Sequence, residues 1–339
     1  MTADTLQLTP GPDSDHDGPR EISGGHTGAD RAFNGVARGL GIFVLVLTGA
    51  IGLFLGLQMI PVLRHYGIHF ITGQAWDPDL NVIGILAAIF GTVEIATIAL
   101  LVSFPLAIGT ALFITELAPR RLRSLLVSLV DLMAAVPSIV YGLWGLFLLE
   151  PHVIHLSRWL AEYFGWFPLF HVSTDAHSAT WQESKFTSSA FIAGIVVAMM
   201  VTPLACAVMR GVFAQAPLGE REAALALGST KWGVIRTVVL PFGRGGIIGG
   251  TMLGLGRALG ETIAVLFIIS FVYKINWHAL QNGANTISAL IANNFSAATS
   301  LQLKALEAAG FVLFLMTLVV NTIAGIIVSR SRSGAATEI

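Results

Sequence analysis

The sequence predicts an all-α integral membrane protein with six transmembrane helices. Its composition is 54% apolar and only 12% charged, with a mean hydropathy of +0.75, which lies outside the range of soluble domains. The apolar runs are also long enough for a hydrocarbon core, which needs about 20 helical residues. The expected spans cover residues 40–62, 90–114, 124–149, 190–212, 245–272 and 308–329.

Lysine and arginine are distributed unequally over the two sides that these spans create. If the N-terminus lies in the cytoplasm, thirteen of the 19 basic residues are cytoplasmic and five lie on the opposite side. The remaining one, Arg257, lies within the fifth span. The positive-inside rule therefore predicts that both termini are cytoplasmic and that the 210–244 loop faces the cytoplasm.

The residues outside the spans suggest a simple domain organisation. Residues 1–34 are rich in Asp, Gly, Thr and Ser and are predicted to be a disordered cytoplasmic tail, without a cleavable signal peptide, ahead of a membrane domain over 35–332. Residues 150–189 are predicted to be a long external segment. Its clustered aromatic residues favour a membrane-interface belt, with docking of an external protein as the alternative.

Proline residues predict kinks or breaks in the second and third spans. The second contains Pro105 and Gly109, and the third has Pro137 near its middle. Proline lacks an N–H and its ring clashes with the preceding turn, so it interrupts a helix. Inside a membrane such breaks are tolerated where neighbouring helices or a water-lined path satisfy the freed carbonyl groups. Both spans therefore point to a functional interior.

The 210–244 loop carries two short helix patterns between membrane-length spans. Pro217 suits the first helical position, and the acidic residues after it favour the positive first turn of a helix. Gly228 is expected to end this helix. Ser229 is a suitable N-cap for a second helix, which must end before Pro241. A structured element in this position is suited to contact a soluble partner.

The fifth span contains two strong charges in apolar sequence, Arg257 and Glu261. On a continuous helix, residues four apart share one face and would neutralise each other. Arg257 would lie about 15 Å into the span, near the midplane, where an unpaired arginine costs at least about 2.5 kcal/mol. Because the guanidinium donors match two oxygens of a tetrahedral oxyanion, we expect this pair to line an anion pathway. The alternative is an ion pair that fixes helix packing.

Three further observations concern pathway, metal and enzyme chemistry. Glu94, near the outer end of the second span, is another candidate for the pathway, with a simple interface residue as the alternative.

No cysteine or carboxylate completes a metal set around the histidine pairs, so no metal site is predicted. No lysine lies in a phosphate-cradling loop, so ATP hydrolysis would require another chain, and no catalytic residue is expected.

The 210–244 loop resembles the Glu-Ala-Ala loop of ABC importer permeases. The matching residues are Glu222, Ala223, Ala224, Gly228, Val238, Leu240 and Pro241, with Val238 where isoleucine is usual. In that family the loop forms the coupling helix, which sits in a groove of the ATP-hydrolysing subunit. The resemblance therefore implies that Glu222, Ala223, Ala224 and Gly228 contact an ATPase.

Three other stretches resemble the membrane subunits of phosphate-specific ABC importers, and the PstC type more than its PstA partner. They are residues 136–147, with Pro137 and Tyr141, residues 254–262, with Arg257 and Glu261, and residues 291–295. The resemblance covers roughly residues 35–330. It implies a six-transmembrane-helix type I ABC importer permease of the MetI-like fold, with Arg257 and Glu261 on the phosphate path. Pro137 and Tyr141 would form a helix-break motif.

The resemblance also implies partners. These would be a PstA-like second permease, a PstB-like ATPase dimer and an external PstS-like phosphate-binding protein, in the bacterial plasma membrane and without nucleic acid. The ATPase would use ATP and Mg²⁺, and this chain would bind no cofactor. An importer of another oxyanion and an ion-coupled secondary anion transporter remain as alternatives, although the second would not need a Glu-Ala-Ala loop. An intramembrane enzyme would need a nucleophile with a base, or a metal set, within the spans, and no His or Asp-His arrangement lies there.

Overall fold

The computed structural model describes residues 28–77, 80, 82–172 and 183–331. Most of the expected tail, residues 1–27, and part of the expected external segment, residues 173–182, lie outside the described residues. The chain divides into two compact units, residues 1–51 and 52–339. The described part of the first unit is helical, because helix α1 (Gly28–Tyr66) begins there. Residues 28–34, expected in the tail, therefore belong to a helix.

Among the described residues, five helices are long and apolar enough to cross a membrane. They are Arg31–Tyr66, Leu86–Leu117, Ser138–Phe164, Ala190–Phe213 and Ser300–Ser329. A sixth crossing results if Lys231–Phe242 and Arg244–Leu259, which meet at an angle of 68°, are counted as one span. The expected number of six is reached in this way, but several boundaries differ from the prediction.

The predicted third span, residues 124–149, is interrupted at its proline. Helix α4 (Arg120–Ala135) ends there, and a new helix runs through α5 (Ser138–Trp144), the π-helical turn η2 (Gly145–Leu149) and α6 (Glu150–Phe164). The predicted boundaries were wrong because hydropathy does not show where one continuous apolar run changes helix. The first part of the expected external segment is therefore the end of a membrane-length helix.

The second span is not broken at its proline, and the fifth span departs from the prediction. Helix α3 (Leu86–Leu112) is unbroken at Pro105 and ends in a π-helical turn, η1 (Phe113–Leu117). Its long contact with helix α7 (Ala190–Phe213) holds it together despite the proline. In the fifth span, by contrast, helix α11 (Arg244–Leu259) ends early, and the short helix α12 (Ile263–Ile268) follows a three-residue break.

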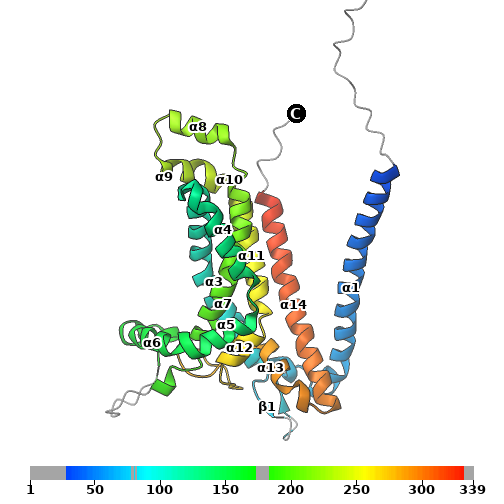
Figure 1. Ribbon diagram of the computed structural model, residues 1–339. Helices are drawn as coiled ribbons and strands as arrows, with labels where there is room; N and C mark the ends of the chain where they lie inside the picture. The colour runs from blue at the N-terminus through cyan, green and yellow to red at the C-terminus, as the bar shows by residue number, and fades with distance from the viewer. Residues whose placement is uncertain (1–27, 78–79, 81, 173–182, 332–339) are drawn as a thin grey trace, which may run out of the picture. The chain divides into compact units, whose positions relative to one another are not determined.

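Shorter elements connect these helices. They are α2 (His69–Thr72), the antiparallel strands β1 (Trp76–Asp77) and β2 (Val82–Ile83), the 3-10 turns η3 (Pro168–Phe170), η4 (Glu183–Lys185) and η6 (Phe295–Ala297), and helix α13 (Ile287–Asn294) before the last helix, α14 (Ser300–Ser331). Between α7 and α11 lie α8 (Leu218–Ala226), α9 (Lys231–Val234), the π-helical turn η5 (Ile235–Val239) and α10 (Leu240–Phe242). Within residues 52–339, α8, α9 and α10 lie at one end of the helices, and α6, α12, α13 and β1 lie at the other (Figure 1).

Helix α7 is the centre of residues 52–339. It contacts α3, α4, α11 and α12 and is the most buried of the membrane-length helices. Its contact with α11 is close because Gly246, Gly250 and Gly254 lie against it. A Cβ at Gly250 would be 3.0 Å from the carbonyl oxygen of Ala205. Small residues four apart allow membrane helices to approach closely, and this stripe holds α11 in place beside the core.

Candidate functional site

The segment between α7 and α11 contains the predicted helix and glycine stop. Pro217 is the N-cap of α8 rather than its first residue. At the other end Gly228 has φ +85°, and its N–H donates to the carbonyl oxygen of Leu225 at 2.9 Å. The N–H of Ser229 donates to the carbonyl oxygen of Ala224 at 3.1 Å. This is a Schellman motif, and glycine reaches its left-handed conformation without strain, which explains the stop physically.

The second helix of this segment differs from the prediction at both ends. Thr230, not Ser229, is its N-cap, and the hydroxyl accepts a hydrogen bond from a backbone N–H of the first turn at 3.2 Å. The helix also continues through Pro241, as η5 and α10, instead of ending before it. In the wide π-helical turn the N–H of Leu240 donates to Ile235, five residues back. This changed register accommodates a residue that lacks an N–H.

Arg221 links α8 to the membrane-length helices. Its Nη1 lies 3.2 Å from Oε1 of Glu116 in η1, and its Nη2 donates to the carbonyl oxygen of Phe213 in α7 at 2.6 Å. The side chains of Arg221 and Glu116 are only 19% and 12% exposed, so solvent screens this ion pair less than a surface pair. Sequence reasoning missed the link because the two residues are 105 positions apart.

The rest of α8 is open to contact. Glu222 and Ala223 are exposed, and Ala224 is half-buried. Four large apolar side chains on α8, α9 and the turn between them are also exposed, namely Leu218, Leu225, Leu227 and Trp232, with exposed fractions of 68%, 51%, 88% and 63%. We call these residues, together with Glu222 and Ala223, the α8 surface. Clustered exposed apolar side chains of this kind mark surfaces that contact another protein or a membrane.

Pro137 and Tyr141 act together at the break between α4 and α5. Pro137 cannot donate an N–H to the carbonyl oxygen of Met133, four residues earlier. That oxygen instead accepts a hydrogen bond from the hydroxyl of Tyr141 at 2.9 Å. The N–H of Val136 donates to the same oxygen at 3.3 Å. The break was predicted, whereas its closure by Tyr141 follows only from the structure.

Arg257 and Glu261 do not form the predicted helical pair. Helix α11 ends before Gly260, and no ion pair joins these two described residues. Glu261 is buried, and its Oε1 accepts a hydrogen bond from the N–H of Ala264 at 3.2 Å, while its backbone carbonyl accepts one from Ser288 at 2.7 Å. Its carboxylate therefore caps the first turn of α12. The expected shared helical face was wrong because the helix stops between the two residues.

Arg257 lies on the surface of this chain although its helix is apolar. Its Nη2 donates a hydrogen bond to Sδ of Met200 in α7 at 3.5 Å, and none of the ion pairs found among the described residues includes it. A thioether is a weak acceptor and leaves the positive charge uncompensated. An arginine at membrane depth faces a water-filled path or meets a charged partner, and the described residues provide no such partner.

Glu94 lies on α3 and is half-buried. Its Oε1 is enclosed and has no hydrogen-bond partner among the described residues. Within the same residues, no hydrogen bond or ion pair connects it with Arg257 or Glu261. An enclosed carboxylate oxygen without a partner is uncommon in folded proteins, so Glu94 stays a candidate that stands apart from the other two.

Comparison with known proteins identifies the family. Residues 103–333 match the family described as "Binding-protein-dependent transport system inner membrane component". This chain belongs to that family. The phosphate transport system permease protein PstC of Xylella fastidiosa (strain Temecula1) is 40% identical over 299 residues, which cover 85% of this chain and 90% of that protein. The predicted type of protein, a transport permease of the inner membrane, is thereby confirmed.

Two solved structures confirm the fold. One is a bacterial ABC transporter involved in the import of the acidic polysaccharide alginate, with a TM-score of 0.54, 18% identity and coverage of 88% of this chain and 99% of that chain. The other is the inward-facing MetNI methionine ABC transporter, with a TM-score of 0.52, 12% identity and coverage of 76% and 99%. The expected MetI-like permease fold is therefore correct for this member of the family.

Proposed function

We propose that this chain is a membrane subunit of an ATP-driven importer of inorganic phosphate. The PstC name of its relative supports phosphate as the substrate. A PstA-like permease completes the pathway, a PstB-like ATPase dimer uses ATP and Mg²⁺, and an external PstS-like protein delivers phosphate. This chain binds no cofactor in that assembly. Both termini and the α8 surface face the cytoplasm, and the end that carries α6 faces the binding protein.

The observation that carries the proposal is the attachment of α8. One side chain, Arg221, bonds to η1 and to the end of α7, while the apolar residues of the α8 surface remain exposed. An ATPase dimer that binds this surface and closes when it binds ATP would move α8 as a unit. The displacement would then reach α3 and α7 through Arg221. A secondary transporter has no need for such a surface, so the ABC mechanism is favoured.

Arg257 supplies the anion contact in this mechanism. Its charge is not neutralised by Glu261, whose carboxylate is engaged in capping α12. A tetrahedral phosphate can accept two charge-assisted hydrogen bonds from one guanidinium group. Because Arg257 lies on the surface of this chain, the second permease would close the path around it. Glu261 lies beside the path, and its role there is to fix the start of α12.

The test is uptake of radiolabelled phosphate into vesicles that contain this chain and its three partners, with ATP on the α8 side. We expect uptake to require ATP and to be competed by arsenate but not by sulfate. Vesicles without the ATPase serve as the control. Equal competition by sulfate would favour an importer of another oxyanion. Uptake that follows an ion gradient without ATP would overturn the proposal in favour of a secondary transporter.

A further inference from the structure

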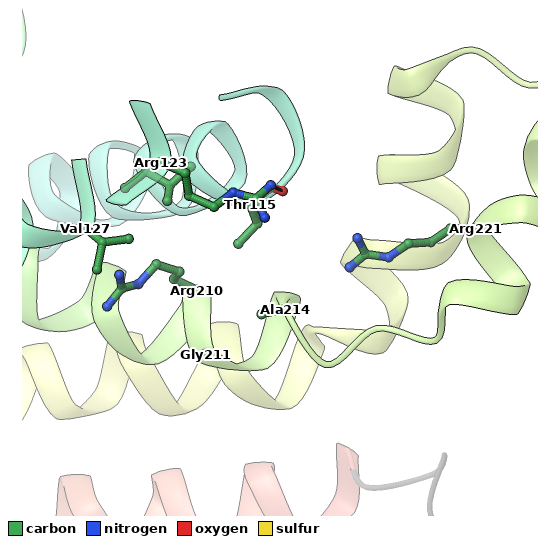
Figure 2. A pocket seen from close by; sticks show the side chains of 8 residues that line it. Thr115, Arg123, Val127, Arg210, Gly211, Ala214 and Arg221 are labelled. Carbon is green, nitrogen blue, oxygen red and sulfur yellow. Dashed lines mark hydrogen bonds between the residues drawn. The ribbon is translucent and has the colours of Figure 1, made fainter. Parts of the chain in front are cut away.

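A pocket of about 390 Å³ lies at the α8 end of the helices, between η1, α4, α7 and α8, and arginine side chains from three of these elements line it (Figure 2). The arginines are Arg123 of α4, Arg210 of α7 and Arg221 of α8. Thr115, Ile114, Val127, Gly211 and Ala214 complete the wall. Arg257 does not contribute to it, so the pocket is separate from the anion path proposed above.

The arginines of this pocket are not fully compensated by acidic residues. Arg210 lies 3.2 Å from Oδ1 of Asp131, and Arg221 is paired with Glu116. Arg123, in contrast, donates to the backbone carbonyl of Thr115, and it takes part in none of the ion pairs found among the described residues. Three positive charges therefore meet two negative ones, which leaves the pocket with an excess positive charge.

A second observation points to a missing acceptor. The Nε of Arg221 is enclosed and has no hydrogen-bond partner among the described residues. Figure 2 shows the side chains of Arg123 and Arg221 extending toward one another from α4 and α8, whereas Arg210 turns toward Val127. Enclosed donors are nearly always bonded, so the present acceptors of Arg221, Glu116 and the carbonyl oxygen of Phe213, do not satisfy all the donors of its guanidinium group.

We propose that this pocket binds a phosphate group, either in the headgroup of an anionic phospholipid or as the free ion. Phosphate oxygens match the planar fork of a guanidinium group and compensate its charge. The pocket lies where the membrane-length helices Leu86–Leu117 and Ala190–Phe213 end, which is the depth of lipid headgroups. Its apolar wall residues, Ile114 and Val127, suit the glycerol and upper acyl part of a lipid. A bound phosphate would join α4 to α8 and so steady the α8 surface.

The test uses the full chain in nanodiscs of phosphatidylcholine, with two additions compared separately: phosphatidylglycerol in the bilayer, or inorganic phosphate in the buffer at matched ionic strength. The readout is the thermal unfolding midpoint, Tm. We expect one addition to raise the Tm by about 2 to 4 °C. A rise with phosphatidylglycerol alone assigns a lipid headgroup, and a rise with inorganic phosphate assigns the free ion. No rise with either addition overturns the proposal.

Two variants separate this pocket from general charge attraction. Arg123→Gln should abolish the Tm rise. This variant should still fold, because Arg123 is exposed and bonds to a single carbonyl oxygen. Arg121→Gln removes the same charge two residues away on α4, outside the pocket, and should keep the full rise. Val127→Glu, which places a carboxylate in the wall, should also abolish it. An equal rise in all variants would show non-specific attraction and overturn the proposal.

Discussion

Two helix breaks among the described residues, α4–α5 and α11–α12, differ in how their free polar groups are satisfied. At the α4–α5 break, the hydroxyl of Tyr141 bonds the carbonyl oxygen that Pro137 leaves without its helical donor. At the α11–α12 break, Glu261 caps the following helix, but Arg257 keeps an exposed charge with only a sulfur acceptor. The first break is satisfied by the chain itself. The second leaves a charged group for something outside it, as expected of a transport path.

The two breaks are also neighbours. Helix α5 contacts α12, and Gly142, the residue after Tyr141, packs so closely that a Cβ there would lie 2.9 Å from Cα of Ala264. The same Ala264 donates its N–H to Glu261. The α4–α5 break, whose free carbonyl oxygen is hydrogen-bonded, therefore packs against the start of α12. This contact supports the backbone of the α11–α12 break, where the charge of Arg257 is uncompensated. Mutations can test whether the difference between them is real.

The largest effect is expected at the open break. Arg257→Gln should lower phosphate uptake about tenfold or more, because the charge-assisted contact with the anion is lost. The Tm of the assembled complex should stay the same within about 1 °C, since no carboxylate of the described chain is left unpaired. Uptake into vesicles and the Tm of the same preparation check both parts.

Arg257→Lys is the matched variant for charge. It keeps the positive charge but loses the fork of donors, so uptake should fall between that of the native chain and that of Arg257→Gln. Native uptake by the glutamine variant in an intact complex would show that Arg257 is not on the path. The substrate proposal would then depend on the relatives alone.

A smaller effect, on stability alone, is expected at the closed break. Tyr141→Phe should lower the free energy of unfolding by about 1 kcal/mol, because the Met133 carbonyl loses the shorter of its two hydrogen bonds and keeps only the one from the N–H of Val136. Uptake per folded molecule should be unchanged. Tyr163→Phe is the control, since Tyr163 is 64% exposed and spans no break. Equal destabilisation of both variants would contradict the assigned role of Tyr141.

The sequence predicted features that depend on local chemistry and missed those that depend on distant contacts. The helix stop at Gly228 and the break at Pro137 follow from the backbone preferences of glycine and proline. The link from Arg221 to Glu116 could not be foreseen, because it joins residues that only the packing of α3 and α8 brings together. The missed break before Glu261 did have a signal. Gly260 directly follows α11, and glycine disfavours the interior of a helix, but the apolar sequence around it masked this signal. Unlike Gly228, Gly260 has a negative φ of −93° and does not form a left-handed cap.

The smallest expected effect is that of Glu261→Gln. Substitutions at Glu261 test most directly how the α11–α12 break differs from the α4–α5 break. Glu261→Gln keeps an oxygen that can accept the N–H of Ala264, so the free energy of unfolding should change by less than about 0.5 kcal/mol. Glu261→Ala removes this cap and should cost about 1 kcal/mol. Chemical unfolding of both variants measures the difference.

Uptake by Glu261→Gln then decides whether the charge of Glu261 matters to the path. If Glu261 serves to cap α12, uptake should stay within about twofold of the native chain, because the hydrogen bond matters and the charge does not. A loss as large as that of Arg257→Gln would mean that the two charges act together during transport. Arg257 and Glu261 would then pair in another conformation of the protein. The difference between the α11–α12 break and the α4–α5 break would in that case hold only for the conformation of this structure.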